Sequence, residues 1–184
     1  KNKIIWKKNI TIKGDQGHNI GGGLAVDNKF LFIGSPYAEL FCLELNTGEL
    51  VWKNNTITPI RATPTLVDNK VIILTSDNRI LVFEKEDGAL IWEHQGIQNT
   101  TAIIGEPKVA VEGNLVLAPY SNGDIFALNL INGRELWKQT SVNIEQSETS
   151  NSFSDIDANP VILKNIAIIA STSGKFFAIN KKNG

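Results

Sequence analysis

Residues 41–53 read FCLELNTGELVWK, and close variants of this stretch recur along the 184-residue chain. The second copy is LVFEKEDGALIWE at residues 81–93, and the third is IFALNLINGRELWK at residues 125–138. A fourth copy, FFAINKKNG at residues 176–184, stops before its tryptophan, and IIWK at residues 4–7 matches the end of an earlier copy. Self-similarity at this period predicts a repeat architecture.

Each copy has the pattern of two strands joined by a tight turn. The residues before the turn are β-branched, aromatic or otherwise apolar, and the turn contains a glycine, which adopts positive φ without strain. Gly48, Gly88 and Gly133 lie 40 and 45 residues apart, and each is followed four residues later by a tryptophan. A second apolar hairpin precedes each copy, at residues 24–33, 65–74, 109–118 and 161–169.

The repeating unit is therefore a four-stranded antiparallel sheet, and stacked sheets of this kind define an all-β fold, the β-propeller. We expect residues 1–184 to be part of a single propeller of about four blades, and this part to belong to an eight-bladed ring. The expected blades cover residues 20–53, 60–93, 102–138 and 158–184, with residues 1–13 as the last strand of a preceding blade. Two alternatives are a closed four-bladed ring, completed by the strand of Trp6, and an open β-sandwich, which would not explain the glycine-to-tryptophan spacing.

The tryptophans occupy a fixed place in the repeat, on the strand after the turn. A carbohydrate-stacking platform is one use for such side chains, but their periodicity favours packing of one blade on the next. We therefore predict a structural role for Trp6, Trp52, Trp92 and Trp137.

Composition excludes several classes of protein. The 18 Lys and Arg residues nearly balance the 19 Asp and Glu residues, so the net charge of −1 gives no electrostatic reason to expect nucleic-acid binding. No apolar run approaches the roughly 20 residues of a membrane-spanning helix. Cys42 is the single cysteine, so no intramolecular disulfide can form.

The repeat resembles that of the pyrroloquinoline-quinone-type propellers, a superfamily with two relevant branches. One branch comprises the quinoprotein dehydrogenases, and the other is the BamB family, which carries no cofactor. Residues 102–107 (AIIGEP) and 153–161 (FSDIDANPV) are similar to two loops of the BamB family, and together with the repeat the resemblance covers essentially the whole chain.

This resemblance implies a non-enzymatic protein on the periplasmic face of the outer membrane, with no cofactor and no metal. Family members are lipoproteins whose two loops bind a POTRA domain of the barrel-assembly subunit, and outer-membrane proteins would be clients. The lipid anchor would lie outside this chain. The contact positions carried over from the family are Thr101, Ile103, Ile104, Asp155 and Asp157. Family members usually have an arginine where this chain has Ile104.

The residues alone leave other interpretations open. Asp155 and Asp157 could belong to a solvated loop in which one carboxylate caps a turn, and Ile103 and Ile104 could be core residues of a strand. A fragment of a quinoprotein dehydrogenase is the alternative function, although those enzymes commonly carry adjacent cysteines and this chain has only Cys42. A propeller that binds some other protein is the third possibility.

Overall fold

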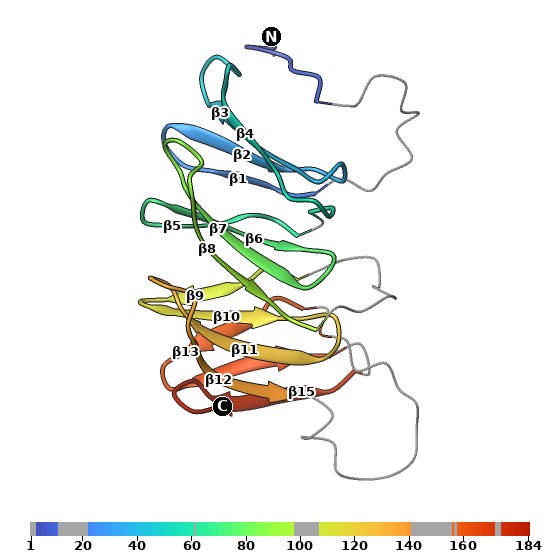
Figure 1. The fold of residues 1–184 in the computed structure, drawn as a ribbon, viewed down its shortest axis with the longest axis vertical. Coiled ribbons are helices and arrows are strands. Elements are labelled where there is room, and N and C mark those ends of the chain that lie inside the picture. Colours follow the sequence, from blue (N-terminus) through green and yellow to red (C-terminus); the bar gives the residue numbers. More distant parts are fainter. Residues whose placement is uncertain are drawn as a thin grey trace.

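The computed structural model describes residues 3–10, 22–60, 62–97, 107–140, 156, 158–171 and 174–184. Within these ranges the chain forms strands and turns and contains no α-helix, so the predicted all-β class is confirmed. The strands assemble into four antiparallel sheets, each built from consecutive segments of the chain (Figure 1).

The sheets are called blades 1 to 4. Blade 1 contains β1 (Leu24–Val26), β2 (Phe30–Gly34), β3 (Glu39–Glu44) and β4 (Leu50–Asn55). Blade 2 contains β5 (Thr65–Val67), β6 (Lys70–Thr75), β7 (Arg79–Glu84) and β8 (Leu90–Gln95). Blade 3 contains β9 (Ala110–Glu112), β10 (Leu115–Pro119), β11 (Asp124–Asn129) and β12 (Glu135–Thr140). Blade 4 contains β13 (Val161–Leu163), β14 (Ile166–Ala170) and β15 (Phe176–Asn180).

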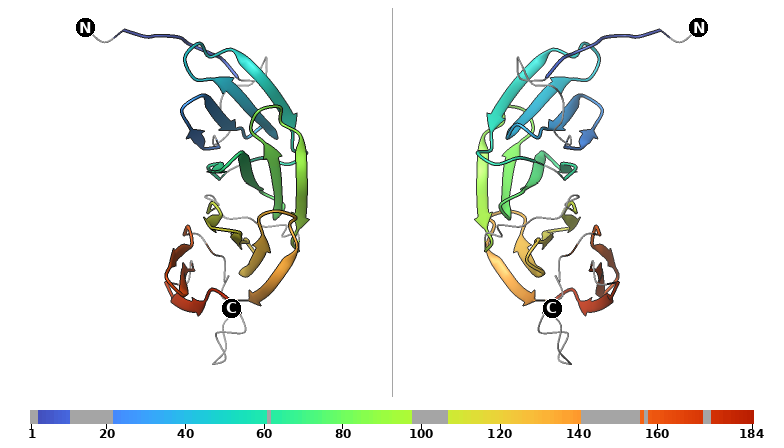
Figure 2. Two further views of the ribbon diagram at one scale, coloured as in Figure 1. Left: turned by 90° about the vertical axis from the view of Figure 1, so that its left-hand side faces the viewer. Right: turned by 90° about the vertical axis from the view of Figure 1, so that its right-hand side faces the viewer.

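The blades stack face to face along a curved arc (Figure 2). The first strands lie on its concave side, where β1 contacts β5 and β9 contacts β13, and the fourth strands β4, β8 and β12 lie on its convex side. The chain ends lie at opposite ends of the arc (Figures 1 and 2). The structure is thus part of a β-propeller, as predicted, and it is an open arc rather than the alternative closed ring of four blades.

Apolar side chains fill the space between neighbouring blades. In β6, Val71 packs towards blade 1 while the next residue, Ile72, packs towards blade 3, and both are fully buried. In β10, Val116 packs towards blade 2 and Leu117 packs towards blade 4. Successive side chains of a strand point to opposite faces, so an uninterrupted apolar strand is what a sheet covered on both faces requires.

The strand order gives the arc two distinct edges. The turns between first and second strands and between third and fourth strands lie at one edge, here named the turn face (on the left in Figure 1). The turns between second and third strands lie at the other edge, and the chain also leaves β4, β8 and β12 there to enter the next blade. This second edge is named the connection face.

Residues 3–10, expected as the last strand of a preceding blade, form no paired strand in the described part of the chain. The segment nevertheless contacts blade 1, because the indole Nε1 of Trp6 donates to the carbonyl of Leu45 at 2.9 Å. The other strands that such a blade needs for backbone pairing are not among the described residues.

Candidate interaction surfaces

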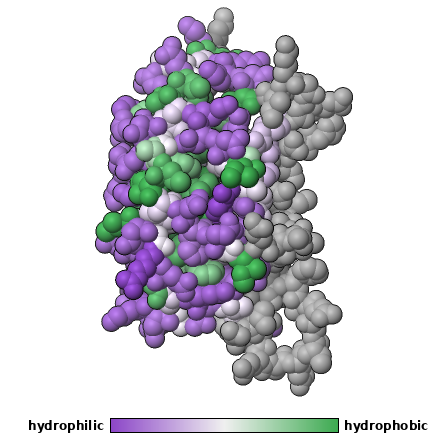
Figure 3. Space-filling model, viewed as in Figure 1, coloured by the Kyte–Doolittle hydropathy of each residue, from purple (hydrophilic) through white to green (hydrophobic). Residues whose placement is uncertain are grey.

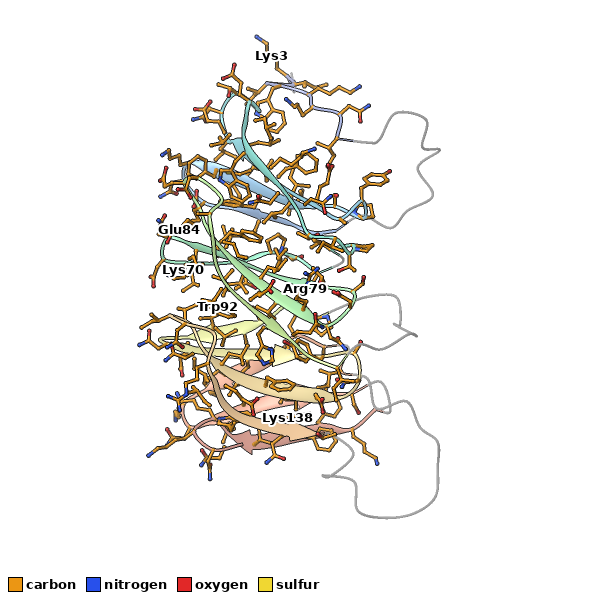
Figure 4. All side chains as sticks on the ribbon, in the orientation of Figure 1. Lys3, Lys70, Arg79, Glu84, Trp92 and Lys138 are labelled. Atoms are coloured by element: carbon orange, nitrogen blue, oxygen red, sulfur yellow. The ribbon has the colours of Figure 1, made fainter. Side chains whose placement is uncertain are left out.

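The turn face is dominated by a contact that repeats at every interface between blades. The indole Nε1 of Trp52 donates to the carbonyl of Lys85 at 2.8 Å, and that of Trp92, which is labelled in Figure 4, donates to the carbonyl of Leu130 at 2.9 Å. Trp137 donates to the carbonyl of Lys181 at 3.0 Å, and Trp6 makes the equivalent bond described above. The single polar group of each tryptophan, the indole N–H, is thereby hydrogen-bonded to the turn of the following blade, while its rings cover apolar surface.

The repeated glycines lie under these rings. Gly133 has φ of 71°, and a Cβ atom built on it would lie 2.6 Å from Cε3 of Trp92. Gly48 meets Trp6, Gly88 meets Trp52 and Gly184 meets Trp137 in the same way. The fixed glycine-to-tryptophan spacing of the sequence therefore corresponds to a contact between neighbouring blades, in which the tryptophan of one blade covers the glycine of the next.

Ion pairs between blades surround these contacts on the turn face. Lys85 Nζ lies 3.2 Å from Asp27 Oδ2, and Lys29 Nζ lies 2.7 Å from Glu86 Oε2. Burial raises the pKa of Asp27, but the backbone N–H groups of Phe30 and Lys29 and the ammonium of Lys85 outweigh it and lower that pKa overall. The Lys29–Glu86 pair is exposed, and exposed ion pairs are worth about 0–1 kcal/mol each. The Lys85–Asp27 pair is more buried, because the side chain of Lys85 is only 11% exposed.

The sequence places its candidate contact residues in two connections whose described ends lie at the connection face. Thr101, Ile103 and Ile104 belong to the connection between β8 and β9, and Asp155 and Asp157 to that between β12 and β13. All five residues lie outside the described residues. The described residues at the ends of these two connections do, however, show how the connections are attached to the blades.

Asn78 holds the start of the first connection. This residue is buried in the turn between β6 and β7, with φ of 60°. Its Nδ2 donates to the carbonyl of Ile97 at 2.8 Å, and its Oδ1 accepts hydrogen bonds at 2.9 Å from the backbone and the hydroxyl of Ser121 in blade 3. Asn78 therefore fixes the exit from β8 and joins blade 2 to blade 3.

Asn159 joins the ends of the two connections. The backbone N–H of Lys108 donates to Oδ1 of Asn159 at 2.8 Å, across 51 residues of sequence. Ile156, which lies between the two candidate aspartates in sequence, is 2% exposed, packs between blades 3 and 4, and forms a bridge with Ser171. The chain thus leaves both connections at neighbouring points, although they belong to different blades.

Sequence reasoning did not single out Asn78 or Asn159. The signals were weak but present, because asparagine tolerates positive φ better than other non-glycine residues and an Asn-Pro pair marks the start of β13. The hydrogen bonds themselves join different blades and have no local signature.

The convex side of the arc carries exposed apolar residues. Leu50, Leu90 and Leu136 are about half exposed on the outer strands, and Figure 3 shows apolar patches that recur from blade to blade on this side. Leu50 and Leu90 stand two residues before their tryptophans, whereas Leu136 stands directly before Trp137, so only the first two are equivalent in the repeat. Single exposed leucines are common on protein surfaces and do not by themselves define a binding site.

The described residues contain little that could carry out chemistry. No group of three or more His, Cys, Asp or Glu side chains in the described ranges could hold a metal ion. A pocket of about 500 Å³ lies between blades 3 and 4 at the turn face, and it is lined by Leu115, Leu136, Asn165, Asn180, Lys181 and Lys182. This lining has no carboxylate, thiol or imidazole.

The thiol of Cys42 and the imidazole of His94 both lie in interfaces between blades. Cys42 is fully buried between blades 1 and 2, where burial raises the pKa of its thiol to about 12. His94 Nδ1 lies 2.8 Å from the hydroxyl oxygen of buried Tyr120, and its ring lies 4.8 Å from that of Phe126. Burial lowers the pKa of His94, opposed by the nearby carboxylate of Glu135.

The fold and these surfaces define a class of protein, the β-propellers of the pyrroloquinoline-quinone-like repeat. Within this class the chain belongs to the family described as outer membrane protein assembly factor BamB, whose model matches residues 1–184. The resemblance stated from the sequence is thereby confirmed. Quinohemoprotein alcohol dehydrogenase from Comamonas testosteroni has the same fold, with a TM-score of 0.65 over 90% of this chain and 34% of that chain at 17% identity.

The relatives extend well beyond this chain. The outer membrane protein assembly factor BamB of Yersinia pestis is 22% identical over 187 residues, covering 99% of this chain and 48% of the relative. The crystal structure of BamB from Moraxella catarrhalis gives a TM-score of 0.76 at 23% identity, over 88% of this chain and 50% of that chain. The chain therefore spans about half the length of the relatives it matches. Its described part contains no helix long and apolar enough to span a bilayer.

Proposed function

We propose that this chain is part of a BamB-type assembly factor that acts on the periplasmic face of the outer membrane, attached there by a lipid anchor. In this role it is a non-enzymatic scaffold that binds a POTRA domain of the barrel-assembly subunit and helps outer-membrane proteins reach it. Membership of the BamB family supports the general role. The specific partner rests on the resemblance of two connections to the loops of that family.

The observation that carries the proposal is the hydrogen bond between Lys108 and Asn159 at the connection face. It holds together the ends of the two connections that contain Thr101, Ile103, Ile104, Asp155 and Asp157. Residues from two blades can therefore contribute to one surface, on which an apolar group and an acidic pair would meet apolar and basic residues of the partner. Interfaces of this kind combine a small apolar centre with charged groups that orient the partner.

A binding measurement with purified POTRA domains tests this proposal. Calorimetry should show that replacing Asp155 and Asp157 together with Asn weakens binding about tenfold or more, because the change removes two negative charges and keeps the shape of both side chains. The affinity of the unmodified chain should also fall with added salt.

The matched control is replacement of Asp68 and Asp87 with Asn, which removes the same charge from the turn face. We expect this control to bind like the unmodified chain. Equal affinities for the two double variants would show that the acidic pair is not the contact.

A separate measurement addresses the alternative function, a quinoprotein dehydrogenase. The purified chain is mixed with pyrroloquinoline quinone and calcium and then desalted. The proposed scaffold retains no quinone absorbance, whereas a chromophore that remains with the protein would favour the enzyme.

A further inference from the structure

Tyr120 departs from the repeat at a buried position of the connection face. It begins the turn between β10 and β11, and it is 0% exposed. Counted from the glycine of each repeat, its counterparts in the other three blades are the small hydroxyl residues Ser35, Thr75 and Ser171. A large ring therefore occupies a place where the other blades have a small side chain, and it needs room that the repeat does not otherwise provide.

Gly96 provides this room. It follows β8 directly, at the place that Thr56 occupies after β4, and its backbone N–H donates to the carbonyl of Asn78 at 2.8 Å. A Cβ atom on Gly96 would lie 2.5 Å from Cδ2 and Cε2 of Tyr120, so the ring fits here because this residue has no side chain. Gly96 also begins the connection between β8 and β9, which contains the candidate contact residues Thr101, Ile103 and Ile104.

His94 is the hydrogen-bond partner of the tyrosine hydroxyl. Its counterparts in the repeat are Asn54 and Gln139, whose side-chain amides instead donate to the glycine of the next repeat. Nδ1 of His94 lies 2.8 Å from the hydroxyl oxygen of Tyr120, and the two rings are stacked with their centroids 6.0 Å apart. Three residues that differ from the repeat therefore meet at the interface between blades 2 and 3, namely His94, Gly96 and Tyr120.

The start of this connection depends on its neighbours more than the start of the preceding one does. After β4, the connection is held by a side chain of its own, because Thr56 Oγ1 donates to the carbonyl two residues further on at 2.8 Å. Gly96 has no side chain to make such a bond. Here the ring of Tyr120 lies against Gly96, and Asn78 binds the carbonyl of Ile97. Blade 3 and the turn of blade 2 therefore determine where the connection begins.

We propose that Tyr120 and His94 are positioning residues, which hold the connection between β8 and β9 for partner binding while His94 is neutral and release it when His94 is protonated. Neutral imidazole accepts the proton of the Tyr120 hydroxyl at Nδ1, whereas imidazolium donates from both nitrogens and leaves this buried hydroxyl without its acceptor. The ring of Tyr120, and with it Gly96, then loses its fixed position. This inference rests on the proposed function, because it concerns binding of the same partner.

Charged groups of blade 3 surround this pair. Burial lowers the pKa of His94, opposed by the carboxylate of Glu135 in β12. Burial raises the pKa of Tyr120 and the carboxylate of Asp124 in β11 raises it further, so the phenol keeps its proton at neutral pH. Asp124 is itself paired with Lys138 of β12 at 2.8 Å. The imidazole is therefore the group of the pair that changes its charge.

The direction of the pH dependence follows from the lowered pKa of His94. In the sheet of blade 2, His94 is paired with Ile80 of β7, which is apolar, and its neighbour Glu93 in β8 points to the opposite face. The folded chain takes up the proton only below the ordinary pKa of histidine, about 6.5. Partner binding should therefore be fullest above about pH 6.5 and should weaken as pH falls below it.

Calorimetric titration with purified POTRA domains at about pH 7.5 and about pH 5 tests this inference. Between these two values, the affinity of the unmodified chain should fall about fivefold more than that of His94→Gln, since glutamine accepts the same hydrogen bond without titrating. Titration of the partner is common to both proteins and cancels in the comparison. Tyr120→Phe keeps the ring and removes the hydroxyl, so its affinity should depend on pH as that of His94→Gln does.

Hydrogen exchange of the free chain follows the same change without the partner. When the pH is lowered over the same range, peptides covering residues 95–97 and 119–123 should lose protection in the unmodified chain but not in His94→Gln, after correction for the intrinsic effect of pH. Asn54→His is the matched control, because it places a histidine at the equivalent position of blade 1, where Thr75 stands in place of the tyrosine. This variant should not lose protection in residues 55–57 at low pH.

The two measurements distinguish a failure of this inference from a failure of the proposed function. If the unmodified chain binds no POTRA domain at either pH, the proposed function fails, and the exchange measurement still decides whether His94 controls the start of the connection. The same pH dependence in the unmodified chain and in His94→Gln, in binding or in exchange, would overturn the inference.

Discussion

At the turn face, neighbouring blades are joined by the same indole contact each time, from Trp6 on Gly48 to Trp137 on Gly184. At the connection face, the joining side chains are single asparagines, Asn78 between blades 2 and 3 and Asn159 between blades 3 and 4. The first edge repeats because it performs one structural task at every interface. The side chains at the second edge differ between these two interfaces, so this edge can vary without loss of the repeated contact.

This difference implies that stability and recognition can be altered separately. Variants at the turn face should lower the free energy of unfolding, and variants at the connection face should change binding with little effect on folding.

Replacing Trp92 with Ala should destabilise the chain by about 3–5 kcal/mol, because it removes a large buried side chain between blades 2 and 3. Unfolding in guanidinium chloride, followed by the fluorescence of the remaining tryptophans, measures this loss. Trp92→Phe keeps most of the apolar contact and loses the bond to Leu130, so it should cost less. A loss below about 1 kcal/mol for Trp92→Ala would contradict the packing role.

Replacing Gly133 with Ala should destabilise the chain by about 1–3 kcal/mol more than the same change at Gly113. Both glycines have positive φ, 71° and 55°, but a Cβ on Gly133 would meet Trp92 at 2.6 Å, whereas one on Gly113 meets nothing within 4 Å. The Gly113 variant therefore measures the backbone cost alone. Thermal unfolding of the two variants side by side gives the difference, and equal losses would show that the ring does not limit the space.

Replacing Asn159 with Ala should weaken the binding of POTRA domains several-fold and change stability by less than about 1 kcal/mol. The residue is exposed, and its bond to Lys108 is what ties the two connections together. Calorimetric titration and thermal unfolding of the same preparation measure both quantities. Unchanged binding would show that the hydrogen bond between Asn159 and Lys108 does not affect recognition of the partner.

The smallest expected effect concerns pH. Burial lowers the pKa of His94 in the folded chain below the ordinary 6.5, so the unfolded state binds a proton first as pH falls. Stability should therefore be fullest above about pH 6.5 and should decline in the range below it as pH falls. In His94→Gln this decline should be smaller when unfolding is measured across that range, because the titrating group is absent. If the free energy of unfolding changed with pH in the same way in both proteins, His94 would not be the group responsible.

The sequence predicts the turn face well, because a glycine with positive φ and a tryptophan four residues later leave a local and periodic trace. It also predicts the uninterrupted apolar strands, since both faces of β6 and β10 are covered. One substitution within the repeat could have been noticed. His94 stands two residues after its tryptophan, where Asn54 and Gln139 donate amide hydrogen bonds to Gly88 and Gly184.

The connection face is harder to predict, because its bonds join residues far apart in the chain. Asn78 meets Ser121 across 43 residues, and Lys108 meets Asn159 across 51. Lys108 and Asn159 occupy the same place in the repeat, 25 residues before Gly133 and Gly184, but the residue type at this place differs between the blades and leaves no recognisable pattern. The candidate contacts Thr101, Ile103, Ile104, Asp155 and Asp157 rest on family resemblance alone and remain predictions.

Hydrogen exchange of the chain with and without POTRA domains tests the separation of the two faces most directly. The account predicts slower exchange in peptides that cover residues 98–107 and 141–157, and unchanged exchange in the turns at 45–49, 85–89 and 130–134. Protection of those turns, or of the outer strands β4, β8 and β12, with no change in the two connections would contradict it.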